Sequence, residues 1–396
     1  MVEYKTSNLG NIGNVCMCKR VLKSQTSKSG EIPFYKISTF GGQADAFIDK
    51  KMFEEYKKKY NYPKKGDVLI SASGTLGKIV EYDGKDAYFQ DSNIVWIAND
   101  EKKVLNKYLK YFYETKPWIK TNSSTIERLY NDNIRAIEIR YPVSLEQQKA
   151  IIKPLELIDY KIAINNKIIG NLKDYCKTVY EHWFLQFDFP DNNGKPYASS
   201  NNKMIWNEEI SKKIPVGWEV KMVKDFGKLT MGQSPKGNTY NSNSEGVPLL
   251  NGATELTENG ISINKYTLSP TRICHVNDWI FCIRATLGNI QKADKEYCLG
   301  RGVASFTPKV AIYDEYIYFN IYNILERYKK TLSGSIIVGI QKDEFNNSLM
   351  ISPPCDIIEK FHLVTSKVFK KINTLEKQNI NLIELKQSIL PNILDI

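Results

Sequence analysis

The sequence predicts an α+β protein built from two tandem copies of one α/β domain, each followed by a long helix, with the two helices paired as an antiparallel coiled coil. Three observations predict this arrangement: an internal repeat with constant spacing, mixed strand and helix signals in each copy, and a heptad pattern after each copy. Self-similarity at a fixed spacing indicates one structural unit used twice.

The internal repeat is clearest around a turn that occurs in both halves. Residues 65–70 lead into a Thr-Leu-Gly turn at 75–77, and residues 276–281 lead into a second one at 286–288. The same offset then separates Pro142 from Pro353. The halves share little identity outside the turn, so the sequence predicts one fold carrying two different sets of surface residues.

Each copy shows the same order of strand and helix signals. In the first copy, β-branched and aromatic residues predict strands at 31–38, 67–71, 78–82, 94–98 and 134–141, with a short amphipathic helix at 106–115. The matching helix and last strand of the second copy are expected at 314–330 and 348–352. Strands outnumber helices in both copies, which predicts an α+β domain.

A long helix is expected after each of these prolines, at 144–185 and at 355–394. Ser144-Leu145-Glu146-Gln147 fits a capping box at the start of the first helix. Apolar residues then recur at alternating steps of four and three along both helices, which indicates a coiled-coil seam. The predicted seam positions are Ile151, Leu155, Ile158, Ile162, Asn165, Ile169, Leu172, Cys176, Val179 and Trp183 in the first helix, and Phe361, Thr365, Val368, Ile372, Leu375, Asn379, Leu382, Lys386, Ile389 and Ile393 in the second.

The seam predicts a pair of buried asparagines. If the helices run antiparallel with the ends of the seams aligned, Ile151 faces Ile393 and Asn165 faces Asn379. A buried asparagine pair can fix the register of a coiled coil at some cost in stability. The alternative is that each asparagine lies at the solvated edge of an imperfect seam.

These patterns divide the chain into five segments. The first domain is expected at 1–143, its helix at 144–185, the second domain at 215–354 and its helix at 355–394. The segment 186–214 is rich in Asn, Gly, Ser, Pro and Lys, which predicts a linker.

Charge and cysteine usage limit the class of partner. The chain has 55 Lys and Arg against 44 Asp and Glu, a net charge of +11, which favours a nucleic acid over a membrane surface as partner. A soluble protein that merely happens to be basic is the alternative. The seven cysteines are scattered without a C-x-x-C pair, as in reduced cytoplasmic proteins. We find neither a secretory signal nor an apolar stretch long enough for a membrane span, so no membrane contact is expected.

Several short motifs resemble the specificity subunit of type I restriction–modification systems, in an order that covers essentially the whole chain. They are Leu145-Glu-Gln-Gln-Lys149, His182-Trp-Phe184, Phe187-Asp-Phe-Pro190, Asn193-Gly-Lys-Pro-Tyr197 and Ile214-Pro-Val-Gly-Trp-Glu219. The resemblance implies that 1–143 and 215–354 are target-recognition domains, each reading one half of a split double-stranded DNA target.

The same resemblance implies the partners. The two helices would hold the domains apart and dock methyltransferase subunits, in a complex that also contains restriction motor–nuclease subunits. S-adenosylmethionine would be bound by the methyltransferase subunit, with no cofactor on this chain. Phosphate neutralisation by the basic surplus fits this role.

Candidate DNA-contacting residues are polar side chains beside the shared turn that differ between the copies, together with further polar residues elsewhere in each domain. Because the two domains should read different bases, the turn itself is more simply structural. Arg suits guanine and Asn suits adenine in the major groove. The candidates are Lys36, Ser71, Ser73, Lys78, Gln90 and Arg128 in the first domain, and Lys236, Arg284, Asn289 and Arg301 in the second.

Two rival interpretations remain open. The first is a self-contained DNA methyltransferase or nuclease, for which Ser352-Pro-Pro-Cys355 and Pro190-Asp191 with Glu219-Val-Lys221 are loose matches. Neither has its expected context, and three scattered histidines predict no metal site, so we expect no catalytic residue here. The second rival is a coiled-coil interaction protein that does not touch DNA.

Overall fold

The computed structural model describes residues 2–74, 76–119, 128–257, 260–284, 287–331 and 339–394. The chain divides into two compact units: unit 1 is Met1–Ile162 with Asn381–Ile396, and unit 2 is Ala163–Ile380. Each unit contains one α+β domain, and both long helices belong partly to each unit.

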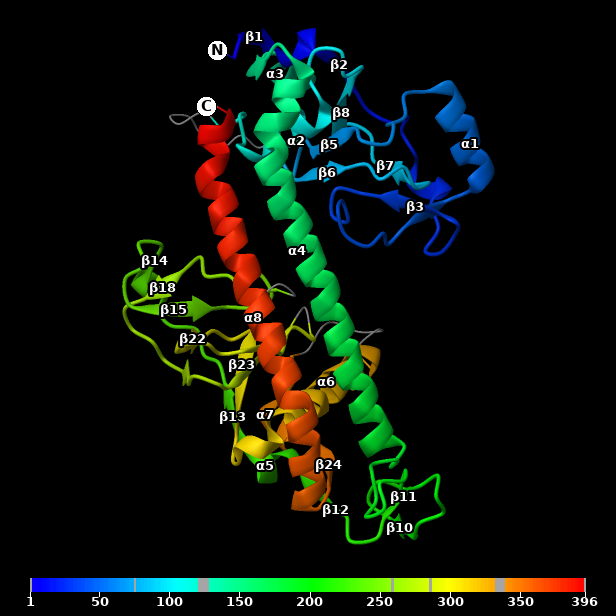
Figure 1. The fold of residues 1–396 in the computed structure, drawn as a ribbon, viewed down its shortest axis with the longest axis vertical. Helices are drawn as coiled ribbons and strands as arrows, with labels where there is room; N and C mark the ends of the chain where they lie inside the picture. The colour runs from blue at the N-terminus through cyan, green and yellow to red at the C-terminus, as the bar shows by residue number, and fades with distance from the viewer. Residues whose placement is uncertain are drawn as a thin grey trace. The chain divides into compact units, whose positions relative to one another are not determined.

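The domain of unit 1 is built on an antiparallel sheet with strand order β2-β8-β5-β6 (Figure 1). Its strands are Gly13–Cys16 (β2), Ile94–Asn99 (β8), Val68–Ser71 (β5) and Ile79–Glu81 (β6). A second sheet, β4-β3-β7, consists of Phe47–Ile48, Ile32–Tyr35 and Tyr88–Phe89, with β3 and β7 parallel. Tyr4–Asn8 (β1) pairs with Glu138–Pro142 (β9), and the helices are Lys50–Lys59 (α1), Asn106–Glu114 (α2) and Asn131–Arg135 (α3).

The domain of unit 2 has a matching sheet with strand order β13-β23-β20-β21. Its strands are Gly227–Met231, Val303–Pro308, Trp279–Cys282 and Ile290–Lys292. The second sheet, β14-β18-β15-β22-β19, consists of Tyr240–Asn241, Tyr266–Thr267, Val247–Leu250, Tyr297–Leu299 and Ile273–Cys274. Glu219–Met222 (β12) pairs with Leu349–Ser352 (β24), and Leu256–Thr257 (β16) with Gly260–Ile261 (β17). The helices are Val223–Phe226 (α5), Asp314–Thr331 (α6) and Lys342–Asn346 (α7).

The two domains repeat the same architecture, as the spacing of the sequence predicts. In both, the first and last strands pair with each other. In both, one strand pair of the second sheet is parallel, β3 with β7 and β15 with β22. Tyr108 of α2 donates to the Arg140 carbonyl at 3.0 Å, and Tyr316 of α6 donates to the Ile351 carbonyl at 2.6 Å. The repeat therefore extends to individual side-chain contacts.

The last strand of the first domain starts later than expected. Residues 134–141 were predicted as one strand, but Ile134 lies in α3 and β9 begins at Glu138. The side chain of Asn133 accepts from the Tyr130 amide and so caps this helical turn, a local contact that the apolar pattern does not reveal.

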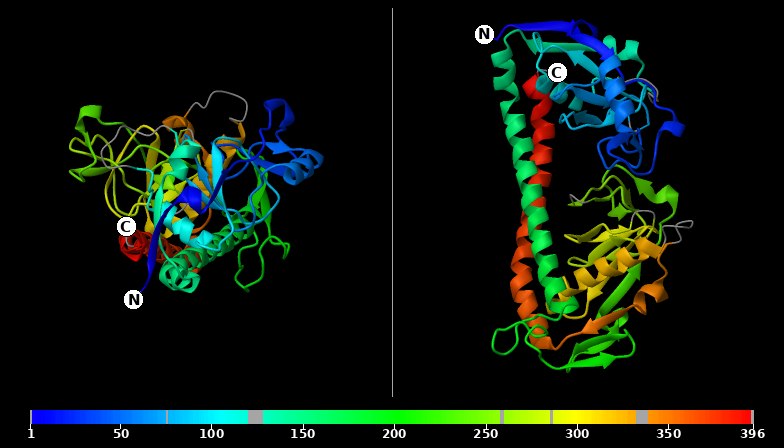
Figure 2. Two further views of the ribbon diagram at one scale, coloured as in Figure 1. Left: turned by 90° about the horizontal axis from the view of Figure 1, so that it is seen from above. Right: turned by 90° about the vertical axis from the view of Figure 1, so that its right-hand side faces the viewer.

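The two long helices are Leu145–Tyr180 (α4) and Cys355–Leu394 (α8), of 36 and 40 residues. Every predicted seam position in them is buried or half-buried. Within unit 1, Asp159 of α4 pairs with Lys386 of α8 at 2.7 Å, and within unit 2, Lys173 pairs with Glu376 at 3.0 Å. In each unit the helices therefore lie side by side and antiparallel (Figure 2).

Gln148 fixes the start of α4 on the first domain. Its side-chain amide donates to the carbonyls of Lys103 and Pro142, both at 2.8 Å, and its oxygen accepts from the Leu105 amide at 2.9 Å. Ser144 caps the same turn by accepting from the Gln147 amide at 3.4 Å. The Gln148 side chain is fully buried, so the rest of the domain holds this helix end in one position.

A charged network joins α8 to the first domain. Lys386 pairs with Glu114 of α2 at 2.6 Å and with Asp159, which also pairs with Lys110 at 2.9 Å. Burial alone would raise the pKa of Asp159, but hydrogen bonds from Lys386 and Lys110 outweigh burial and hold the pKa below its ordinary value. The carboxylate is therefore kept charged between the two helices.

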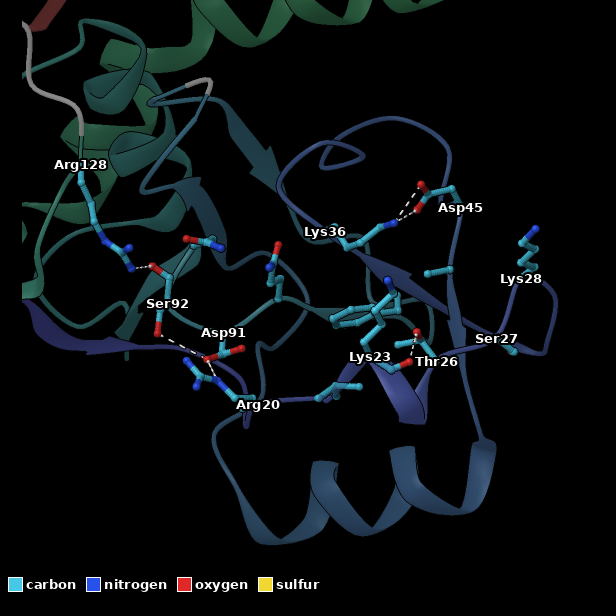
Figure 3. A pocket seen from close by; sticks show the side chains of 15 residues that line it. Arg20, Lys23, Thr26, Ser27, Lys28, Lys36, Asp45, Asp91, Ser92 and Arg128 are labelled. Carbon is cyan, nitrogen blue, oxygen red and sulfur yellow. Dashed lines mark hydrogen bonds and ion pairs between the residues drawn. The ribbon is translucent and has the colours of Figure 1, made fainter. Parts of the chain in front are cut away.

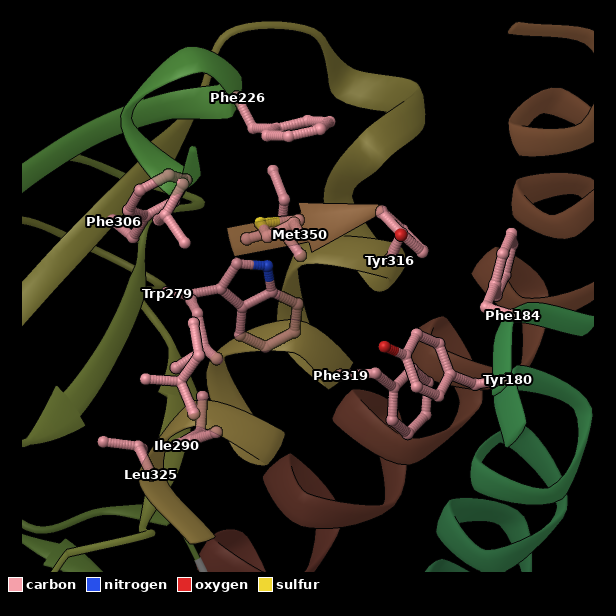
Figure 4. Close-up of a cluster of buried hydrophobic side chains, with 14 of the residues drawn as sticks. Tyr180, Phe184, Phe226, Trp279, Ile290, Phe306, Tyr316, Phe319, Leu325 and Met350 are labelled. Carbon is pink, nitrogen blue, oxygen red and sulfur yellow. The ribbon is translucent and has the colours of Figure 1, made fainter. Parts of the chain in front are cut away.

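The segment 186–214 is part of the folded second unit, so its prediction as a linker is wrong. A π-helical turn at Glu181–Leu185 ends α4, and a hairpin follows from Met204–Asn207 (β10) and Lys212–Pro215 (β11). Phe189 stacks on Tyr197 and Trp218, with ring centroids 4.7 and 4.9 Å apart. Phe184 lies in the same aromatic core between α4 and α6 (Figure 4). A few buried aromatic residues therefore order a segment whose composition is otherwise polar.

Candidate nucleic-acid interface

A hollow in the first domain brings three predicted residues together. Lys36, Gln90 and Arg128 all line one cavity of about 810 Å³ (Figure 3). Lys36 follows β3, Gln90 follows the parallel neighbour β7, and Arg128 lies on the chain that returns towards α3. Because parallel strands end at the same edge of a sheet, the loops after β3 and β7 meet here.

Basic side chains dominate this hollow. Its basic residues are Arg20, Lys23, Lys28, Lys36 and Arg128, and its acidic residues are Asp45 and Asp91. Arg20 pairs with Asp91 and Lys36 with Asp45, both at 2.8 Å. The Lys36–Asp45 pair is exposed and therefore weak, and the basic side chains outnumber the acidic ones. The arrangement therefore suits a polyanionic ligand.

Two of the three predicted residues also hold the walls of the hollow. The side-chain oxygen of Gln90 accepts from the Ile37 amide at 2.9 Å, and the Gln90 amide donates to the Tyr35 carbonyl at 3.0 Å. Arg128 donates to the Ser92 carbonyl at 3.0 Å, and Ser92 has a φ of 60°. These contacts shape the loop at 90–93, and Gln90 has an internal role that the sequence did not predict.

Ser71, Ser73 and Lys78 lie around the shared turn. Ser71 is 1% exposed, and its hydroxyl accepts from the Lys78 amide at 2.7 Å. Burial leaves no surface for a base contact, so the proposal that Ser71 reads DNA is wrong. Ser73 donates to the Asn93 side chain at 2.8 Å, and Lys78 is exposed.

The turn itself is described only in part, because Thr75 and Thr286 lie outside the described residues. Gly77 has a φ of 75°, and a Cβ there would collide with the ring of Trp118. Gly288 has a φ of 108°, a backbone conformation that residues with a side chain rarely adopt. Only glycine fits both positions, which favours a structural role for the turn.

In the second domain, Arg301 and Lys236 lie on loops equivalent to those around the hollow. Arg301 follows β22 as residues 90–93 follow β7, and its amide donates to the Ser234 hydroxyl at 3.2 Å. Lys236 precedes the short helix Gly237–Thr239, just as Leu22 precedes Lys23–Gln25 in the first domain. Both Arg301 and Lys236 are exposed.

Asn289 lies apart from these loops. Its side chain donates to the Leu256 carbonyl at 2.6 Å, and it lines a cavity with Asn166, Lys173 and Glu376 of the long helices. The prediction that Asn289 reads adenine therefore loses its support. Arg284 is exposed at the end of β20 and lies against Gly339.

The sequence interpretation missed Arg20, Lys23 and Lys28. All three lie on the segment that follows β2, a strand that the apolar pattern did not predict. The signal present in the sequence is the cluster of basic residues at 19–28. Its place beside Lys36 depends on the parallel pairing of β3 with β7, which no local pattern reveals.

The two seam asparagines lie in contact within unit 2. Asn165 donates to the Asn379 oxygen at 2.8 Å, and Asn379 donates to the Asn166 oxygen at 2.7 Å. Asn165 is 0% and Asn379 3% exposed. The Asn165 oxygen is buried without a hydrogen-bond partner in the described part of the chain. That the pair fixes the register stays a prediction.

Replacing one seam asparagine should cost more than replacing both. Asn379→Leu removes one of the two acceptors of the buried Asn165 amide, which also donates to Gln378 at 3.0 Å. It also removes the donor to Asn166, and we expect the loss of both hydrogen bonds to lower the free energy of unfolding by about 2 kcal/mol. The Asn165→Leu/Asn379→Leu chain should recover that loss, because two leucines form an ordinary apolar seam. Urea unfolding measures all three chains, with exposed Asn381→Leu as the control. A double variant less stable than the single one would contradict this role.

The loose enzymatic matches have other local contacts. Asp191 accepts from the amides of Asn193 and Lys195 at 2.8 and 2.9 Å, and Glu219 pairs with Lys221 at 2.7 Å. Within the described ranges, no group of three or more His, Cys, Asp or Glu side chains could hold a metal ion. Over the same ranges, no helix is both long and apolar enough to cross a membrane.

Comparisons with known proteins all point to one family. Residues 1–174 and 215–385 each match the family described as type I restriction modification DNA specificity domain. A putative type I restriction enzyme specificity subunit from Haemophilus influenzae is 57% identical over 168 residues, which are 42% of this chain and 43% of the relative. The MjaIX specificity subunit from Methanocaldococcus jannaschii is 23% identical over 99% of this chain and 95% of the relative.

A solved structure has a similar fold. The S subunit of a type I restriction–modification system from M. genitalium aligns with a TM-score of 0.52 at 13% identity, covering 99% of this chain and 96% of that one. The names of these relatives describe specificity subunits, and none of them describes a methyltransferase or a nuclease. Because the family match covers both domains and most of both long helices, this chain belongs to the family of type I restriction–modification DNA specificity subunits.

Proposed function

We propose that this chain is the DNA-reading subunit of a type I restriction–modification complex, in which each domain recognises one half of a bipartite duplex target. The observation that carries the proposal is that equivalent loops recur in both domains with different side chains. Residues 90–93 and 300–302 follow equivalent parallel strands, but the first loop is Gln-Asp-Ser-Asn and the second is Gly-Arg-Gly. One framework with two sets of loop residues suits two different half-sites.

Phosphate contacts supply the affinity in this proposal. The hollow of the first domain carries five basic and two acidic residues, and the whole chain carries a net charge of +11. Positive side chains that neutralise phosphates release bound counterions, which makes duplex binding strong at low salt and weak at high salt. Base contacts then come from loop side chains that reach into the major groove.

The long helices provide the docking surface for methyltransferase subunits. Both helices expose large apolar side chains, with Tyr160 of α4 65% and Leu363 of α8 67% exposed. Apolar side chains on a solvent-facing helix are typical of a surface that a partner covers. In the assembled complex, the methyltransferase subunits bind S-adenosylmethionine, and restriction motor–nuclease subunits complete the assembly in the cytoplasm.

A binding and methylation assay tests this function against the enzymatic alternative. The purified chain should bind random-sequence duplex DNA much more weakly at about 200 mM than at about 50 mM salt. It should transfer no methyl group alone, and methyl transfer should appear when a cognate methyltransferase subunit is added. Methyl transfer by this chain alone would overturn the proposal, and so would binding that does not depend on salt.

A further inference from the structure

Each domain has one arginine at the place where two segments of its backbone pair, but the arginine comes from a different segment in each domain. In the first domain, the Ala72 amide donates to the Asn93 carbonyl at 2.7 Å, and the Leu129 amide donates to the Ala72 carbonyl at 2.8 Å. In the second domain, the Ile283 amide donates to the Gly302 carbonyl at 2.9 Å, and the Ile340 amide donates to the Ile283 carbonyl at 3.1 Å. Ala72 is therefore equivalent to Ile283, and Leu129 to Ile340.

The neighbours of these residues exchange their roles. The backbones of Ser73 and Arg128 form an isolated antiparallel β-bridge in the first domain. The equivalent residues in the second domain are Arg284 and Gly339. A Cβ on Gly339 would lie 2.7 Å from the Arg284 Cγ and 3.0 Å from its Nε. The side chain of Arg284 therefore passes over Gly339, which is the position equivalent to Arg128. Glycine leaves room for it there because it has no Cβ.

We infer that Arg128 and Arg284 are equivalent phosphate anchors, which position each domain on the DNA backbone without reading its sequence. This inference rests on the proposed function and deepens it. Side chains that read bases should differ between two domains with different half-sites, whereas backbone contacts are common to both. Both domains place a guanidinium at this residue pair, although it comes from the second residue of the pair in the first domain and from the first residue in the second domain.

The contacts of the two arginines leave donors available for a phosphate. A guanidinium has five N–H donors in a planar fork that fits phosphate oxygens. Arg128 uses one donor on the Ser92 carbonyl and lies 5.8 Å from the centre of the Tyr130 ring. Arg284 is exposed, and its Cγ and Nε lie against Gly339.

Two competing roles must be separated from phosphate binding. Arg128 could serve only to hold the turn at Ser92, in which case its loss lowers thermal stability. Either arginine could instead read guanine, in which case its loss changes the selected sequence at one position. A phosphate anchor is distinguished by its effect on DNA binding: its loss lowers the affinity for all sequences by the same factor and lowers the salt dependence, whether or not the same side chain also holds the turn.

The test moves the arginine of the first domain to the position used in the second. We compare the full chain with Arg128→Gly, with Ser73→Arg/Arg128→Gly, and with Arg128→Gln, whose amide can still donate to Ser92. Lys102→Ala, on an exposed loop outside the hollow, is the control for losing one positive charge. Dissociation constants are measured on random-sequence duplexes over a range of salt, with the melting temperature of each variant. Arg128→Gln and Arg284→Gln are also used to select bound sequences from a random pool.

Arg128→Gly and Arg128→Gln should each weaken binding about tenfold, the scale of one charge-assisted hydrogen bond. The slope of log K against log salt should fall by about 0.9. Ser73→Arg/Arg128→Gly should return the dissociation constant to within about threefold of the unsubstituted chain, and Lys102→Ala should change it little.

Three results would overturn the inference. The first is a folded Ser73→Arg/Arg128→Gly chain that binds as weakly as Arg128→Gly. The second is an Arg128→Gln or Arg284→Gln chain that selects different bases from a random pool. The third is an Arg128→Gln chain that melts lower but binds normally. Failure of the unsubstituted chain to bind any duplex would instead refute the proposed function itself.

Discussion

Replacing Lys23, Lys28 and Lys36 together with alanine is expected to weaken duplex binding by roughly 100-fold near physiological salt. All three lysines line the hollow of the first domain. If each lysine neutralises one phosphate, the slope of log K against log salt should also fall by about 2.7. Fluorescence anisotropy with labelled random-sequence duplexes, at four or more salt concentrations, measures both quantities.

The matched control removes the same charge elsewhere on unit 1. Lys85, Lys102 and Lys149 are exposed lysines that do not line the hollow. Their triple alanine variant should lose only the small general effect of net charge on association. Equal losses in the two triple variants would mean that DNA responds to the total charge and that the hollow is not the binding surface.

Phe184→Ala is expected to lower the free energy of unfolding by about 3–5 kcal/mol. Phe184 is 1% exposed, and its ring lies 4.6 Å from Tyr316 and 5.0 Å from Phe361, measured between centroids. It therefore joins the end of α4 to α6 and α8 in one aromatic core. Removing the Phe184 ring leaves a cavity that no neighbouring side chain can fill without disturbing the other rings of the core.

The adjacent residue is a natural control for this variant. Leu185 is 39% exposed, so Leu185→Ala should cost less than about 1 kcal/mol. Urea unfolding followed by tryptophan fluorescence compares the two chains. If Phe184→Ala and Leu185→Ala cost the same, the end of α4 is not anchored in the second unit as the packing indicates.

The repeated architecture could be predicted because it depends on spacing and local periodicity. The strands β5 and β20 follow the same turn signals, and the seam residues of α4 and α8 recur at heptad spacing. The contact between Asn165 and Asn379 likewise follows from aligning two regular helices. Regular elements carry their pattern in the sequence itself.

The candidate site was less predictable because its residues depend on contacts between distant segments. Gln90 and Asn289 have the polar side chains expected of base readers, yet each uses its amide group on a nearby backbone group. Ser71 is buried beneath the turn. Residue type alone cannot distinguish a polar group that faces DNA from one that satisfies the fold.

The central claim is that each domain reads one half of a divided target, and target selection tests it most directly. The full chain, together with a cognate methyltransferase subunit, is mixed with random-sequence duplexes, and the bound DNA is sequenced. We predict two short specified sequences separated by a fixed number of unspecified base pairs. A single contiguous motif, or no enriched motif despite binding, would contradict the reading of DNA by two separate domains.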